Sequence, residues 1–172
     1  KVLINPGVKL IPGENIRKKG TDFTKKTVIS KGKFISDMDI MLFAAMGHKE
    51  LLVKKRLSIS ILSVGDELTE PGKICDDHKI YSSNAYGIAS LLRKHSCKPS
   101  ILPIARDNLT VIKKRMDYAI TNSDLIVTSG GASVGAYDLV RKAAKELGLK
   151  VSFEKVNIRP GKPTFAGLLK DT

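Results

Sequence analysis

Four carboxylates follow apolar runs that have the length and composition of buried strands. Asp66 and Glu67 come after the first run, Asp107 comes after the second, and Asp138 stands at the end of the loop after the third. Because Mg²⁺ takes oxygen ligands and commonly joins one or two carboxylates to a substrate's phosphate groups, this set suits a magnesium and phosphate site, with Asp66, Glu67 and Asp138 as the expected metal ligands. Each aspartate alone is more often a helix cap or a turn former. Their shared place at strand ends is what supports the prediction.

A segment rich in glycine and serine joins the third apolar run to a helical pattern. It reads Ser129-Gly130-Gly131-Ala132-Ser133-Val134-Gly135. Backbone N–H groups of such a loop, together with the N-terminus of the following helix, can cradle a phosphate group. The hydroxyls of Ser129 and Ser133 add further donors. The alternative is a tight strand-to-helix turn without a ligand, which needs the same glycines.

Three cations accompany the fourth apolar run. Arg159 and Lys162 belong to a loop with two prolines and a glycine, residues 159–163, which we call the basic loop, and Lys155 precedes it on the expected strand. Proline fixes the backbone φ angle, so this loop is expected to be stiff and to hold its two charges in place for an anion. A solvated basic loop is the alternative that the sequence leaves open.

The elements that position these residues follow from the hydrophobic pattern. From residue 57 onward, strand, loop and helix alternate three times, which is typical of a parallel sheet with helices on its faces. The expected strands are residues 58–64, 101–105, 124–128 and 151–156. The expected helices have apolar faces formed by Ala85, Ile88, Ala89 and Leu92; by Ile112, Met116, Ala119 and Ile120; and by Val140, Ala143, Ala144 and Leu147. Right-handed crossovers place all the loops that follow the strands at one edge of such a sheet, where ligands bind.

The first third of the chain has a different pattern. Short runs at residues 8–11, 28–29 and 34–35 predict strands separated by turns. One helix is expected to begin at a capping box of Ser36 and Asp39 and to end at Gly47. This stretch is too small for a separate domain. We therefore expect a small, partial β-rich segment with one helix at residues 1–54 and an α/β domain at residues 55–172.

The charge of the chain favours an anionic partner. Lys and Arg number 30 against 17 Asp and Glu, a formal net charge of +13 that suits nucleic acid or a phosphorylated small molecule. Only 5% of the residues are aromatic and no zinc-finger pattern is present, which disfavours nucleic acid. No apolar run approaches the roughly 20 residues that span a bilayer, and Cys75 and Cys97 form no disulfide pattern. We expect a cytoplasmic protein that binds neither membrane nor nucleic acid.

Several motifs resemble those of the MoeA family of molybdopterin molybdenumtransferases, whose eukaryotic counterpart is the E domain of gephyrin. Residues 65–72 are similar to the family's G-D-E-L-x-x-P-G stretch, and residues 129–138 to S-G-G-x-S-x-G-x-x-D. The basic loop is similar to K-P-G-K-P, and residues 13–20 to a G-x-x-x-R-x-x-G turn. The resemblance covers nearly the whole chain.

The resemblance implies a fold and a reaction. The fold is a three-layer α/β/α domain with a mostly parallel sheet, like the molybdopterin-binding domain of MoaB and Mog proteins. The reaction is the binding of adenylylated molybdopterin, cleavage of its phosphoanhydride with Mg²⁺ and insertion of molybdate, in an enzyme that is a homodimer. The matched catalytic positions are Asp66, Glu67, Asp107, Asp138, Lys155 and Arg159. The matched cofactor-binding positions are Asn84, Ser129, Gly130, Gly131, Ser133, Gly135 and Lys162.

The chain departs from the family's pattern at two positions. Ser82 stands where the family commonly has aspartate, and Arg159 replaces a lysine, so that a planar guanidinium takes the place of a compact ammonium. The chain also ends before the family's P-G-N-P-V segment, so the resemblance implies a central fragment of the enzyme with its α/β domain truncated. Two alternatives stay open: a molybdopterin adenylyltransferase or CinA-like domain of the same fold, and a basic nucleic-acid-binding module.

Overall fold

The computed structural model describes residues 3, 5–9, 11–29, 32, 34–131 and 138–169. Two compact units make up the chain, Lys1–Val53 and Lys54–Thr172. None of the helices in this described part is long and apolar enough to cross a membrane. The assignment of residues 1–54 and 55–172 to two parts of a larger enzyme stays a prediction.

The first unit contains one helix, α1 (Asp37–Ala45), among the residues described there. Its first turn is closed by the predicted capping box: the Asp39 N–H donates to Ser36 Oγ at 3.2 Å, and the Ser36 N–H donates to Asp39 Oδ2 at 3.0 Å. Gly47 follows the helix with a φ of +86°, the left-handed conformation that ends many helices. The predicted start and end of this helix are therefore confirmed.

The strands predicted upstream of α1 are not found. The described residues upstream of α1 form turns and irregular backbone, with no strand at 8–9, 11, 28–29 or 34–35. Val8, Val28 and Phe34 are exposed there. Runs this short need a paired neighbour to satisfy their backbone N–H and C=O groups, and the prediction rested on composition alone.

A parallel sheet forms the centre of the second unit. It consists of β1 (Ser58–Ser63), β4 (Lys98–Ile101) and β5 (Leu125–Ser129), in the order β4-β1-β5. Ser60 of the central strand pairs with Ser100 on one side and with Ile126 on the other. The interior of β1 is buried, as expected for a parallel strand covered on both faces.

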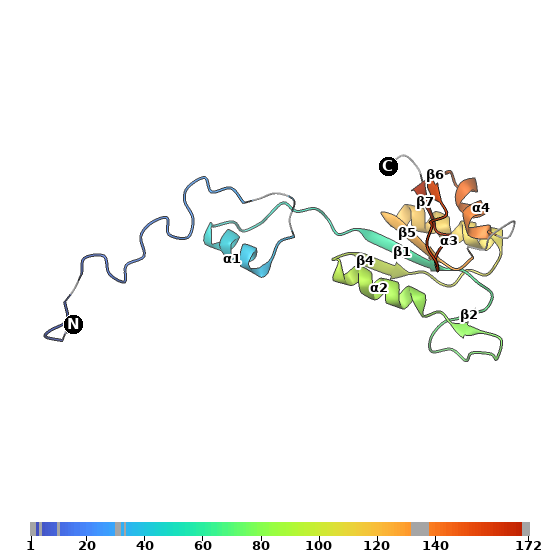
Figure 1. Cartoon of the computed structure of the whole chain (residues 1–172), viewed down its shortest axis with the longest axis horizontal. Coiled ribbons are helices and arrows are strands. Elements are labelled where there is room, and N and C mark those ends of the chain that lie inside the picture. The colour runs from blue at the N-terminus through green and yellow to red at the C-terminus, as the bar shows by residue number, and fades with distance from the viewer. Residues whose placement is uncertain are drawn as a thin grey trace. The chain divides into compact units, whose positions relative to one another are not determined.

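Helices cover both faces of this sheet (Figure 1). Ile61 of β1 packs against Ala85 and Ala89 of α2 (Asn84–Lys94). Its neighbour Leu62 faces the opposite side, toward α3 (Leu109–Asn122) and α4 (Leu139–Glu146). Successive strand residues point to opposite faces, so this alternation produces three layers. The predicted α/β fold with a parallel sheet is confirmed, as are the apolar faces of the three helices.

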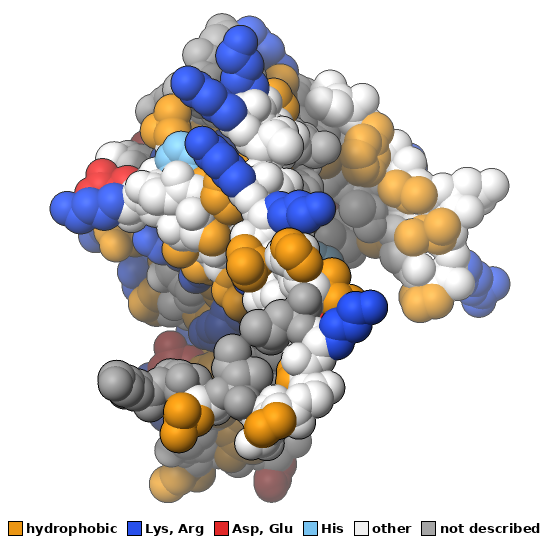
Figure 2. All heavy atoms as spheres, turned by 90° about the vertical axis from the view of Figure 1, so that its left-hand side faces the viewer, with side chains coloured by type: hydrophobic (Ala, Val, Ile, Leu, Met, Phe, Trp, Pro, Cys, Tyr) orange, Lys and Arg blue, Asp and Glu red, His pale blue; other side chains and the backbone are white. Residues whose placement is uncertain are grey.

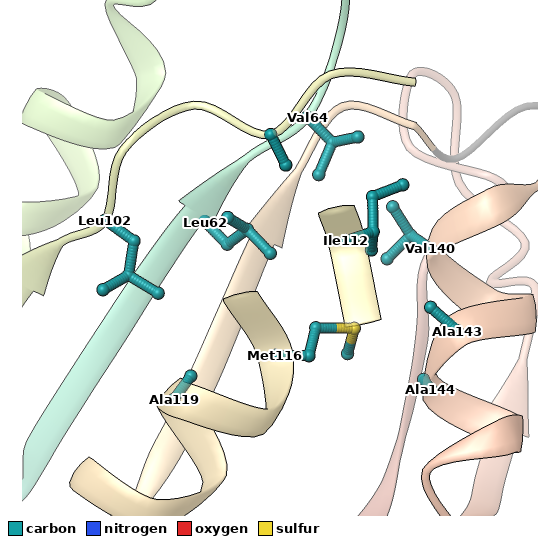
Figure 3. Packing of buried hydrophobic residues seen from close by; sticks show 10 residues of the cluster. Leu62, Val64, Leu102, Ile112, Met116, Ala119, Val140, Ala143 and Ala144 are labelled. Atoms are coloured by element: carbon teal, nitrogen blue, oxygen red, sulfur yellow. The ribbon is translucent and has the colours of Figure 1, made fainter. Parts of the chain in front are cut away.

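The main core lies between the sheet, α3 and α4. Figure 3 shows Ile112 of α3 facing Val140 of α4, with Met116 and Leu62 beside them. Ile112 and Val140 have no exposed surface. Because Val140 is the second residue of α4, this contact fixes the beginning of that helix, and with it Asp138, against the rest of the domain.

The fourth predicted strand takes a different place from the one expected. β6 (Leu149–Glu154) pairs antiparallel with β7 (Phe165–Leu169), and the two form a hairpin separate from the parallel sheet. The prediction that this strand continues the parallel sheet is wrong for the described residues. A second strand-forming run follows after a short loop, and pairing with it closes a much smaller loop than pairing with β5. A further short parallel pair joins β2 (Leu68–Thr69) to β3 (Ile80–Tyr81).

Asp124 ties together the chain segments at the amino end of the sheet. Its Oδ2 accepts the Ser58 N–H at 2.8 Å and its Oδ1 accepts Lys55 Nζ at 2.9 Å. These contacts hold the pKa of the Asp124 carboxyl below its ordinary value, and the backbone hydrogen bond from Ser58 has the largest effect. A lowered pKa means that the carboxylate stabilises the fold above its ordinary pKa and that this contribution is lost as the pH falls through the folded-state pKa.

We therefore expect Asp124→Asn to lower the urea midpoint of unfolding at pH 7 slightly, and to differ less from the wild type at pH 3. Urea titrations of both proteins at the two pH values measure this. Lys55→Ala removes the ion pair but keeps the backbone hydrogen bond, so it should retain most of the pH dependence. An equal difference between wild type and Asp124→Asn at both pH values would contradict the assignment.

Candidate functional site

The carboxyl ends of three parallel strands meet at one edge of the sheet. The Val64 N–H donates to the Ser129 carbonyl at 2.9 Å, and the Gly65 N–H donates to the Ala105 carbonyl at 3.0 Å. Val64 and Ala105 also form an isolated parallel bridge beyond the regular strands. The loops after β1, β4 and β5 therefore begin side by side, as the strand–loop–helix pattern predicts.

Asp66 and Asp107 lie next to each other at this edge. The Asp66 N–H donates to Asp107 Oδ2 at 3.1 Å, and the Asp107 N–H donates to Asp66 Oδ1 at 3.3 Å. Arg106 Nη1 donates to the Asp66 carbonyl at 2.9 Å. Each carboxylate thus uses one oxygen to hold the neighbouring loop. Both residues are exposed to solvent.

Glu67 is folded back over the same edge. A β-carbon placed on Gly65 would lie 2.3 Å from Glu67 Oε2, so the carboxylate covers the bare α-carbon of Gly65. The Glu67 carbonyl accepts the Ile80 N–H at 2.9 Å, which anchors its backbone to β3. Three of the predicted acidic residues are therefore gathered around the end of β1.

The glycine turn after β5, Gly130 and Gly131, passes tightly over β1. Gly130 has a φ of +85°, and a β-carbon there would lie 2.1 Å from the Val64 carbonyl oxygen. A β-carbon on Gly131 would lie 2.6 Å from Val140 Cγ2. Only glycine fits both places. The two predicted residues Ser133 and Gly135 lie outside the described residues.

Asn84 and Ser129 are brought together beside the glycine turn. Asn84 Nδ2 lies 3.4 Å from Ser129 Oγ, at the long end of hydrogen-bonding range. Asn84 is the first residue of α2 and stands 45 positions before Ser129 in the sequence. A buried hydroxyl pair lies nearby: Ser82 Oγ donates to Ser63 Oγ at 3.0 Å. Ser82 is thus directed at β1 rather than at solvent.

Asp138 serves as the N-cap of α4. Its Oδ1 accepts the Arg141 N–H at 2.9 Å. Its Oδ2 lies 3.1 Å from Arg141 Nε, an ion pair whose angle does not make a hydrogen bond. Only 8% of Asp138 is exposed. Asp138 thus caps a helix, which is the more common role of a single aspartate in the sequence analysis above. Metal binding by Asp138 stays a prediction.

The fit of this edge to Mg²⁺ depends on the exposed carboxylates. Within residues 34–131 and 138–169, as in the rest of the described chain, no three His, Cys, Asp or Glu side chains are grouped to hold a metal ion. Asp66, Glu67 and Asp107 offer oxygen ligands only, which is the chemistry that Mg²⁺ prefers when a substrate phosphate completes its shell. Asp66 and Asp107, which lie side by side, are the pair that suits an ion whose shell a substrate phosphate completes, whereas Asp138 as arranged faces Arg141.

The basic loop is the turn of the β6–β7 hairpin. The Lys155 N–H donates to the Thr164 carbonyl at 2.9 Å, and the Val156 N–H donates to the Lys162 carbonyl at 3.0 Å. Residues 157–163 line a shallow hollow, with Arg159 and Lys162 exposed. Among the described residues, no hydrogen bond or ion pair joins this loop to Asp66, Asp107 or the glycine turn. The structure therefore brings together three of the four predicted loops.

Arg141 is a residue that site prediction from the sequence did not select. Arg141 stands three positions after Asp138, a spacing that places two side chains on one face of a helix and that signals the ion pair. On the face shown in Figure 2, Lys and Arg side chains are spread among hydrophobic ones, and few carboxylates are visible.

Comparison with known proteins gives consistent matches. The family model described as "probable molybdopterin binding domain" matches residues 60–171. The molybdopterin molybdenumtransferase of Haemophilus influenzae is 35% identical over 161 residues, which cover 93% of this chain and 40% of that protein. Gephyrin of Dictyostelium discoideum is 36% identical over 169 residues, covering 90% of this chain and 23% of that protein.

A solved structure shares the fold. The crystal structure of the molybdopterin biosynthesis MoeA protein of Pyrococcus horikoshii superposes with a TM-score of 0.73 at 27% identity, covering 83% of this chain and 35% of that one. The chain thus spans less than half the length of each of these proteins.

Proposed function

The chain belongs to the molybdopterin-binding domain family of molybdenum cofactor biosynthesis, and from this premise we propose that it binds adenylylated molybdopterin and positions it for molybdate insertion. The observation that supports this most is the convergence of Asp66, Asp107 and the glycine turn at one edge of the parallel sheet. The carboxylates lie at this edge, and the backbone N–H groups of the glycine turn are the donors that we propose. A phosphorylated ligand held with a divalent cation requires both.

The glycine turn is proposed to receive the phosphate of the pterin. Gly130 and Gly131 let the turn pack closely against Val64 and Val140, and the backbone N–H groups of such a turn are the donors that we propose for the phosphate. Asn84 Nδ2 and Ser129 Oγ add side-chain donors at the same place. Ser133 and Gly135 belong to the same proposed binding segment on the family resemblance alone.

Asp66, Glu67 and Asp107 are proposed to hold Mg²⁺ with the substrate's phosphoanhydride. When bound, Mg²⁺ would neutralise charge on the phosphoanhydride oxygens and make the bridging P–O bond easier to cleave. The reciprocal bonds between Asp66 and Asp107 orient one oxygen of each carboxylate toward the neighbouring loop, which directs the other outward. Asp138 is proposed to join this set only if its pairing with Arg141 changes on ligand binding.

Lys155, Arg159 and Lys162 are proposed to attract molybdate. Arg159 presents a planar fork of N–H donors that suits a tetrahedral oxyanion, and Lys162 presents a point charge from the same stiff loop. We propose further that the complete enzyme is a cytoplasmic homodimer that binds neither nucleic acid nor membrane. If sedimentation showed that the complete enzyme stays monomeric at high protein concentration, that result would contradict the proposed dimer.

A test of the magnesium proposal is the double change Asp66→Asn with Asp107→Asn in the complete enzyme. Asparagine keeps a side-chain oxygen to accept the neighbouring N–H, so folding is retained, but both metal-binding charges are lost. Mg²⁺-dependent cleavage of adenylylated molybdopterin should fall about 100-fold or more, because several kcal/mol of charge stabilisation is removed. Cleavage is followed as release of AMP.

The matched control is Asp117→Asn on the exposed side of α3, which should leave cleavage unchanged. Binding of molybdopterin itself, measured by isothermal titration without Mg²⁺, should change little in either variant. Normal Mg²⁺-dependent cleavage in the double variant would remove these carboxylates from the proposed mechanism.

A further inference from the structure

Arg141 connects two parts of the domain that the sequence separates. It lies on α4, and only 19% of its side chain is exposed. Its Nε lies 3.1 Å from Asp138 Oδ2, before the helix, and its Nη1 donates to Glu154 Oε2 at 3.2 Å, at the end of β6. The guanidinium also stacks over the Phe165 ring of β7, 5.4 Å from the ring centre. One side chain thus contacts the helix cap and both hairpin strands.

These contacts differ from ordinary surface ion pairs. Exposed pairs contribute little because water screens both charges, but most of the Arg141 guanidinium is removed from water. Its flat, rigid group offers donors in two directions and a face for an aromatic ring at once. Lys145 Nζ lies 3.1 Å from Glu154 Oε1, and its hydrogen bond is the main reason that the pKa of Glu154 lies below its ordinary value. Glu154 therefore stays charged near neutral pH.

The two carboxylates that Arg141 contacts stand next to the two anion-binding segments proposed above. Asp138 begins the helix that follows the glycine turn, and Glu154 immediately precedes Lys155 and the basic loop. Among the described strands, the hairpin has no backbone pairing with the parallel sheet. Its position relative to the glycine turn is therefore fixed by the short chain connection from α4 to β6 and by side chains. These are the apolar contacts of Leu149, Phe165 and Leu169 with the core, and the polar contacts of Arg141 and Lys145.

We propose that Arg141 is a positioning residue that sets the separation between the glycine turn and the basic loop, so that one ligand with two anionic groups contacts both. The inference rests on the proposed function and adds that the basic loop, besides attracting molybdate, contacts a second anionic group of the ligand whose phosphate lies at the glycine turn. Binding at the first segment then raises the local concentration of the second anionic group at the other. Arg141 contributes to this gain without touching the ligand.

The test compares a ligand with one anionic group and a ligand with two, in the complete enzyme. Arg141→Met keeps the apolar stem and removes the charge, and Glu154→Gln removes the partner on the hairpin. Both variants should bind inorganic molybdate within about threefold of the wild type and adenylylated molybdopterin about tenfold or more weakly. The affinity lost in the double variant should be smaller than the two single losses combined, because both changes break the Arg141–Glu154 contact.

Lys142→Met, one position further along α4 and exposed, is the matched control and should leave both affinities unchanged. Urea unfolding shows whether each variant is folded; if Arg141→Met is not, Glu154→Gln and Arg141→Lys carry the same comparison. The positioning role would be overturned if a folded variant lost equal affinity for both ligands, or kept its affinity for the two-anion ligand. The proposed function would not be affected by either result. Failure of the wild-type enzyme to bind adenylylated molybdopterin would overturn the proposed function and this inference with it.

Discussion

Replacing Gly130 with alanine is expected to destabilise the α/β unit by about 3 kcal/mol or more. The residue has a φ of +85°, which an alanine adopts only with strain, and its new β-carbon would lie 2.1 Å from the Val64 carbonyl oxygen. That oxygen belongs to the backbone at the end of the central strand and cannot rotate away. The β5 loop would have to move off β1, and the proposed phosphate site would be lost with it. Urea unfolding of the wild type and the variant measures the change.

Gly87 provides the matched control for Gly130. It lies within α2, its φ is not in the left-handed region, and a β-carbon there would meet nothing within 4 Å. Gly87→Ala should stabilise the protein by about 0.5–1 kcal/mol, because alanine loses less conformational freedom in a helix. If Gly130→Ala unfolded at the same urea midpoint as the wild type, the glycine turn would not pack on β1 as described.

Removing the two cations of the basic loop is expected to weaken binding of adenylylated molybdopterin about 100-fold or more. Arg159→Ala with Lys162→Ala deletes two charge-assisted contacts to an anion, each contributing about 1.5–3 kcal/mol. Both side chains are exposed at a hairpin turn, so the fold should be retained. Isothermal titration with adenylylated molybdopterin measures the loss.

The control for this pair is Lys94→Ala with Lys114→Ala, two exposed lysines on α2 and α3. Lys113 is less suitable, because its Nζ pairs with Glu146 Oε2 at 2.8 Å. The control should leave pterin binding unchanged. A nucleic-acid-binding module would instead lose DNA or RNA affinity with either pair, and its binding would weaken steeply as salt rises. Unchanged pterin binding in the Arg159 and Lys162 variant would exclude these residues from the site.

The elements that the sequence predicted well are those with a strong internal pattern. Ala85 and Ala89 of α2 and Val140 and Ala143 of α4 are buried as their helical spacing indicates. Asp66 and Asp107 meet because the carboxyl ends of adjacent parallel strands share an edge. The spacing of apolar residues determines whether a segment is a helix or a strand, and the sheet topology then places the polar residues at its edge.

Strand boundaries and strand partners were harder to predict, for reasons that particular residues illustrate. The second strand was expected at residues 101–105, but β4 spans Lys98–Ile101 and includes Pro99. Proline lacks an N–H and is tolerated there because β4 is at the edge of the sheet, whereas Pro103 interrupts the expected run. The alternating pattern of β6 shows a strand but not which strand it pairs with, so its hairpin with β7 was missed.

The central place of β1 has a consequence for how the chain folds during synthesis. Ser58 pairs with Lys98 and Ile59 with Leu125, so both neighbours of β1 are made later than β1 itself. On the ribosome, the apolar residues Ile59, Ile61 and Leu62 therefore emerge well before any partner that can bury them. Parallel pairs of this kind form slowly because long loops must close first. The same strand that forms the centre of the native domain is the one most open to aggregation in the nascent chain.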